Sequence, residues 1–168
     1  MPLQAEGEFA QVKKRLETAL GLSGQPVKRG TMAHMHIVYM MIVDAAATAR
    51  DAETIEKYGP LLEELAIRDE HQPYLAISRR ANGVAHRLKL EFDQAEKYLL
   101  QAQEYFESAG MPWQQGRTLY ELGELALEQK NNSLCQERFT QALEIFDRIL
   151  AKPDSERTKK ALIEVELE

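Results

Sequence analysis

The chain has 168 residues, of which 44% are hydrophobic and 29% charged, the composition of an ordinary globular protein. Its net charge of −6 argues against a nucleic-acid-binding protein, because neutralising a phosphate backbone requires a dense basic surface. No apolar run is long enough to cross a bilayer, and one cysteine, Cys135, excludes an internal disulfide framework and fits a reducing compartment. We therefore expect a cytoplasmic protein without a secretory signal or a membrane segment.

Two helices are predicted in the N-terminal part of the chain. The first covers residues 5–20, in which apolar residues recur at helical spacing, and glycines and a proline predict a loop over residues 21–30. The second helix covers residues 32–50 and contains the continuous apolar run 37–43. Because this helix is apolar on every side, we expect other helices to cover it on more than one face.

The third helical segment is predicted to begin after Asp51, a residue type that caps helix N-termini well. Gly59 and Pro60 lie in its middle. Proline removes a backbone donor and clashes with the preceding turn, so we expect a break or kink there. Residues 61–67 would then form a second short helix.

A forty-residue repeat organises the rest of the chain. Shifting the sequence by forty superposes these pairs: Gly83 and Gly123, Ala95 and Cys135, Leu99 and Phe139, Ala102 and Ala142, Phe106 and Phe146. Prolines separate the predicted helices, which cover residues 74–89, 93–109, 113–129, 133–152 and 154–165. Capping boxes are predicted at the starts of two of them, in the pairs Asp93 and Glu96, and Ser133 and Gln136. Such a period predicts stacked helical hairpins.

The spacing of small and large apolar residues within each copy resembles the tetratricopeptide repeat (TPR). Residues 112–126 look most like the forty-residue repeats at the C-terminal end of bacterial signalling ATPases, cyclases and transcriptional activators. The resemblance implies an all-α, right-handed solenoid of antiparallel helical hairpins with about 7–8 helices. It implies one domain, residues 1–168, made of a leading helix and loop (1–30), a degenerate repeat (31–72), two clear repeats (73–111 and 112–152) and a capping helix (153–168).

The resemblance also implies a function, namely binding of a partner peptide or domain in a concave groove, as part of a bacterial signalling system. Carried over from the family, the groove residues include Arg80, Arg87, Arg117, Tyr120 and Glu124. Because arginine forks bind carboxylates, an acidic peptide is a sensible partner. Alternatively, these arginines pair with nearby glutamates on a solvated face. We expect Arg80 and Arg87 to point outward.

A polar stripe occupies positions that the family fills with apolar residues. It consists of Arg79, Asn82 and His86. One interpretation is that the stripe is buried and hydrogen-bonded, which would allow a small polar pocket and a small-ligand sensor or enzyme. The other is that the helix is rotated, so that Ala81, Val84, Ala85 and Leu88 form its core.

Enzyme and metal chemistry find little support in the sequence. There is no phosphate-binding glycine loop, no HExxH and no pair of cysteines, so we predict neither an enzyme nor a cofactor. His34 and His36 lie among methionines, but residues two apart on a helix point in different directions, so no metal site is predicted. Cys135 is interpreted as inert packing. The remaining alternative is a self-associating scaffold fragment, a homodimer formed through the methionine-rich helix 32–50.

Overall fold

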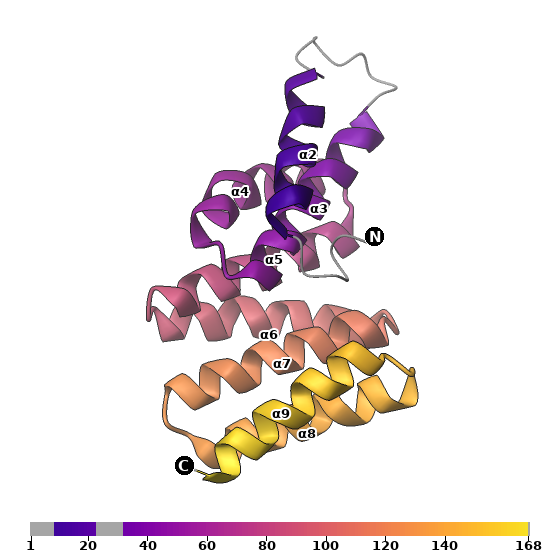
Figure 1. The fold of residues 1–168 in the computed structure, drawn as a ribbon. Coiled ribbons are helices and arrows are strands. Elements are labelled where there is room, and N and C mark those ends of the chain that lie inside the picture. The colour runs from indigo at the N-terminus through magenta and orange to yellow at the C-terminus, as the bar shows by residue number, and fades with distance from the viewer. Residues whose placement is uncertain (1–8, 23–31, 168) are drawn as a thin grey trace. The chain divides into compact units, whose positions relative to one another are not determined.

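The computed structural model describes residues 9–22 and 32–167, and every regular element in these ranges is a helix (Figure 1). The eight helices are α2 (Phe9–Leu22), α3 (Met32–Ala49), α4 (Ala52–Arg68), α5 (Gln72–Leu88), α6 (Phe92–Ser108), α7 (Pro112–Glu128), α8 (Asn132–Arg148) and α9 (Lys152–Leu167). The all-α prediction is confirmed. The predicted loop over residues 21–30 lies, beyond Leu22, outside the described residues.

The turns between consecutive helices from α3 to α9 share one backbone conformation. Six residues spaced twenty apart have positive φ angles between 53° and 62°: Arg50, Glu70, Leu90, Gly110, Lys130 and Leu150. The bonds after α6 illustrate how a helix is closed, since the Gly110 N–H donates to the Glu107 carbonyl and the Met111 N–H to the Phe106 carbonyl. The forty-residue repeat of the sequence is therefore a pair of twenty-residue units, each a helix and a turn.

The chain divides into two compact units, residues 1–89 and residues 90–168. In the first unit α3 packs against α2, α4 and α5. Its second half supplies much of the buried apolar surface, through Ile42, Val43, Ala45, Ala46 and Ala47. Because α3 contacts three other helices, the prediction that it is covered on more than one face is confirmed.

Helix α4 continues through Pro60, so the prediction of two separate helical segments is wrong. Contacts from α5 support the chain at this point. The Ser78 hydroxyl donates to the Gly59 carbonyl at 3.1 Å, and Asn82 Oδ1 lies so close that a β-carbon at position 59 would be 2.7 Å from it. Pro60 itself is exposed. The proline ring therefore lies on the solvent side of the helix, while contacts from α5 hold the buried side together.

The second unit is built from α6, α7, α8 and α9 around aromatic side chains. A β-carbon at Gly123 would lie 2.5 Å from the Phe139 ring, and one at Gly116 would lie 2.7 Å from the Phe146 ring. These two glycines let α7 approach α8 closely. The predicted capping boxes are wrong, because α6 and α8 begin earlier than expected, after Glu91 and Asn131.

Candidate interaction surface on the second unit

Two arginines and two aromatic rings lie together where α7 meets α9. The Arg117 guanidinium lies 4.7 Å from the centre of the Trp113 ring, and the Arg157 guanidinium lies 4.1 Å from the centre of the Tyr120 ring. Asp154 links the two pairs. We call Trp113, Arg117, Tyr120, Asp154 and Arg157 the aromatic–arginine surface. Both contacts have the geometry of a cation–π interaction.

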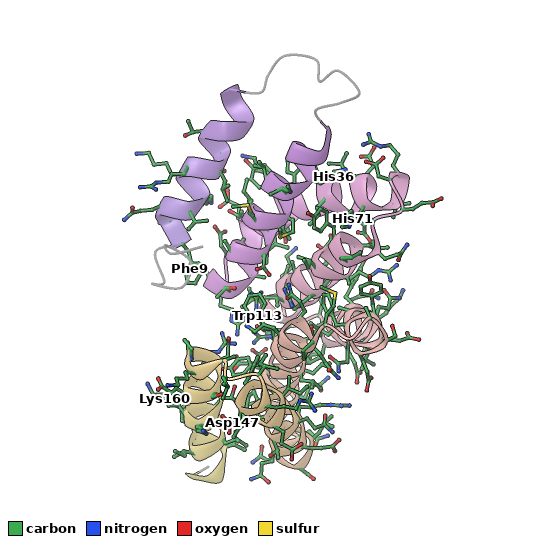
Figure 2. The ribbon with its side chains drawn as sticks, turned by 90° about the vertical axis from the view of Figure 1, so that its right-hand side faces the viewer. Phe9, His36, His71, Trp113, Asp147 and Lys160 are labelled. Carbon is green, nitrogen blue, oxygen red and sulfur yellow. The ribbon has the colours of Figure 1, made fainter. Side chains whose placement is uncertain are left out.

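Asp154 orients the aromatic–arginine surface from the first turn of α9. Its Oδ2 accepts a hydrogen bond from Trp113 Nε1 at 3.0 Å, and its Oδ1 accepts one from Arg157 Nη2 at 3.3 Å. Trp113 nevertheless remains 44% exposed. Figure 2 labels it at the start of α7. An indole held in one orientation with half of its surface in solvent is well suited to contact another molecule.

Local sequence explains why these two helices start where they do. Pro112 occupies the first turn of α7, where its fixed φ angle favours the helix and its missing donor costs nothing. Asp154 in the first turn of α9 adds a negative charge where the helix dipole is positive. Trp113 and Asp154 therefore lie in the first turns of these two helices.

The electrostatics around Tyr120 keep its phenol neutral. Burial raises the pKa of Tyr120 well above its ordinary value, and the nearby Glu124 carboxylate raises it further, whereas Arg157 opposes the rise. Glu124 is half-buried, and Glu121, one turn earlier, is buried. The two arginines of the surface are thus accompanied by acidic groups on α7.

Arg80 and Arg87 do not point outward, and that prediction is wrong. Each is only 2% exposed. Arg80 Nη2 lies 2.6 Å from Asp44 Oδ1, so the guanidinium of α5 pairs with a buried carboxylate of α3. A guanidinium is buried when a carboxylate compensates its lost hydration, and the partner here is 36 residues away in the chain. Of the other predicted groove residues, Arg117 and Tyr120 belong to the aromatic–arginine surface but are themselves buried, and Glu124 lies beside them.

The polar stripe of α5 is half-buried along its whole length. Asn82 Nδ2 lies 3.4 Å from Glu63 Oε2 of α4. Ala81, Val84 and Ala85, which the rotated-helix interpretation placed in the core, are buried, whereas Leu88 is exposed. The rotated-helix interpretation is therefore correct at three of its four positions. The polar stripe lies at the edge of this buried face.

His36 and Cys135 are both buried. His36 is buried with Nε2 2.9 Å from Asp69 Oδ2, and its ring approaches those of His71 and Tyr74. The side chain of His34 lies outside the described residues. No group of three potential metal ligands is found within residues 9–22 and 32–167. Burial, with the charge of Glu124, raises the pKa of Cys135 to about 11, so the thiol stays protonated.

Sequence reasoning missed Trp113, Asp154 and Arg157. The signal for Arg157 was present, because it lies forty residues after Arg117 and therefore occupies the same position in the next repeat. Residues 153–168 were interpreted as a polar cap. A capping helix is not expected to contribute to a binding surface.

Comparisons with known proteins leave the family of the chain open. No family model matches the chain, and the searches of curated proteins and of solved structures gave no match. Within the described ranges no helix combines the length and the apolar character needed to cross a bilayer. The TPR resemblance accordingly stays a prediction.

Proposed function

We propose that this chain is a non-enzymatic protein-interaction module, a TPR-like right-handed solenoid of helical hairpins that binds a partner protein through the aromatic–arginine surface. One observation carries the proposal. Trp113 and Arg157 lie on two adjacent helices and are both partly exposed, whereas Arg117 and Tyr120, which contact them, are buried. Tryptophan, tyrosine and arginine are the residue types that contribute most binding energy at protein interfaces.

The chemistry of the surface favours a peptide that carries both an apolar and an acidic side chain. Stacking on an aromatic ring uses the face of a guanidinium and leaves its edge for hydrogen bonds to carboxylates. Arg157 gives one such bond to Asp154. The exposed part of Trp113 offers the apolar contact. We place the module in a bacterial signalling system on the resemblance of residues 112–126, and in the cytoplasm on the cysteine content and apolar pattern of the sequence.

A displayed peptide library tests the proposal. We expect the wild-type chain to enrich peptides that combine an aromatic or aliphatic residue with Asp or Glu. Trp113→Ala should weaken binding of the enriched peptides at least tenfold. Leu150→Ala is the matched control, because Leu150 is an even more exposed apolar side chain of the same unit outside the surface. Equal binding by both variants, or no enrichment by the wild type, would contradict the proposal.

A second candidate function is self-association through α3. Ile37 is 40% exposed, and the neighbouring Val38, Tyr39, Met40 and Met41 are only half-buried, so the first half of α3 presents apolar area to solvent. Sedimentation equilibrium distinguishes the candidates. A homodimer that Ile37→Glu converts to monomer would favour self-association, whereas a monomeric wild type over the accessible concentration range would exclude it.

A further inference from the structure

A cleft of about 330 Å³ opens between α2, α3 and α4 in the first unit. Its walls are apolar and come from Phe9 and Ala10 of α2 and from Ile42 and the alanines of α3. Ala45, Ala46 and Ala49 are too small to fill the space next to α2. The volume falls within the range typical of small-molecule sites, about 300 to 1,000 Å³. The cleft is partly open to solvent, so an apolar body of matching size would pack one side against these walls.

One end of this cleft is closed by an ion pair. Lys13 Nζ of α2 lies 3.0 Å from Asp51 Oδ2. Asp51 is held in place independently of that contact, since it also accepts hydrogen bonds from the Thr54 amide at 3.0 Å and from the Thr54 hydroxyl at 2.6 Å. Lys13, in contrast, reaches Asp51 through a long, flexible side chain that is 37% exposed. The carboxylate is the fixed partner and the ammonium is the movable one.

Three carboxylates and two ammonium groups lie around this end of the cleft. The carboxylates of Asp51, Glu17 and Glu53 all act on Lys13 and raise its pKa. Glu17 also accepts a hydrogen bond from the Tyr58 hydroxyl, and its carboxylate lies 3.9 Å from the ammonium of Lys57. Burial raises the pKa of Asp51, but hydrogen bonds from Thr54 and Lys13 outweigh it and lower the pKa overall. Asp51 is therefore anionic at neutral pH.

We propose that the cleft binds a compact organic cation, an apolar body carrying a primary ammonium group that replaces Lys13 on Asp51. The fixed carboxylate supplies the recognition, and the surrounding carboxylates disfavour an anionic ligand. A cavity of about 150 Å³ holds one benzene molecule, so this cleft has room for roughly two fused rings. The proposal concerns the first unit and is independent of the aromatic–arginine surface.

Titration calorimetry on the full chain with three matched probes tests the charge preference. The probes are 1-naphthylmethylamine, the neutral 1-naphthylmethanol and the anionic 1-naphthoate, all at neutral pH. We expect the amine to bind at least tenfold more tightly than the alcohol, and the carboxylate to bind more weakly than both. No binding of the amine, or equal affinity for all three probes, would overturn the proposal.

Two variants locate the binding site. Ala49→Leu should reduce affinity for the amine at least tenfold, because position 49 lines the cleft but is exposed enough to accept a larger side chain. Thr140→Leu, an exposed site on α8, is its control. Lys13→Gln should increase affinity by removing the competing ammonium, whereas Lys14→Gln, on the exposed face of α2, should not. Binding that neither Ala49→Leu nor Lys13→Gln changes would place the amine elsewhere and overturn the proposal.

Discussion

Arg80 and Asp44 form an ion pair in the interior of the first unit, with Arg80 Nη2 2.6 Å from Asp44 Oδ1. The pair joins α5 to α3 across 36 residues of sequence. Both side chains are buried, so each charge depends on the other to offset its lost hydration. Substitution of either residue alone should therefore be much more damaging than a surface change.

We expect Arg80→Ala to lower the free energy of unfolding by about 3 to 5 kcal/mol, because it leaves a buried carboxylate without this partner. Urea denaturation followed by circular dichroism measures the loss. Arg79→Ala, at the half-buried neighbouring position, is the control and should cost less than about 1 kcal/mol. Equal losses for the two variants would show that the ion pair contributes nothing particular to stability.

The close approach of Gly123 to Phe139 predicts that a single added methyl group is not tolerated. Alanine normally favours a helix over glycine by about 1 kcal/mol, yet Gly123→Ala should destabilise the protein by about 1 to 3 kcal/mol because its β-carbon meets the ring. Phe139→Ala alone should cost about 3 to 5 kcal/mol. In the double variant the glycine substitution should lose most of its cost. Additive effects would mean that the two residues are not in contact.

The left-handed turns predict opposite effects of glycine substitutions. Gly110 has a φ angle of 62° and no atom near its β position, so Gly110→Ala should destabilise by about 1 to 2 kcal/mol through backbone strain alone. Leu150 has a φ angle of 59° and a largely exposed side chain, so Leu150→Gly should stabilise the protein. Thermal unfolding of both variants measures the shifts. A lower melting temperature for Leu150→Gly would show that its side chain contributes more than the strain costs.

The lowered pKa of Asp51 predicts that the stability of the protein depends on pH. Its pKa is lower in the folded chain than in the unfolded chain, so its stabilising effect is present above the unfolded value of about 3.9 and is lost as the pH falls through the folded value. The difference in unfolding free energy between wild type and Asp51→Asn should be constant near neutral pH and shrink below about pH 4. Denaturation at pH 7 and pH 3 measures it, and a difference that grows on acidification would reverse the assignment.

The sequence predicted the helices well because their signals are local or periodic. The apolar run of residues 37–43 predicts a helix that is covered on several sides, and the forty-residue period predicts helices of equal length. The errors have a common physical cause. The burial of Arg80 depends on a carboxylate of another helix, and the continuity of α4 through Pro60 depends on contacts from α5. Such tertiary contacts are not encoded in the spacing of neighbouring residues.

The candidate sites were predictable only in part for the same reason. The sequence indicates Arg117 and Tyr120 as candidate binding residues. It does not indicate Trp113, whose ring contacts Arg117, or Asp154, which orients that ring. Asp51 was recognised as a helix cap, yet its second role, closing a cleft with Lys13, requires knowing that α2 lies beside α4. The cap role of Asp51 can be predicted from neighbouring residues, whereas its contact with Lys13 cannot.

The six left-handed turns at twenty-residue intervals restrict how this chain can change in length. Each added residue within a helix would rotate the following side chains by about 100° and move the next turn out of register. A single insertion or deletion inside a helix should therefore strongly destabilise the folded chain. Addition of a whole helix-and-turn unit of twenty residues, in contrast, keeps the spacing of the turns.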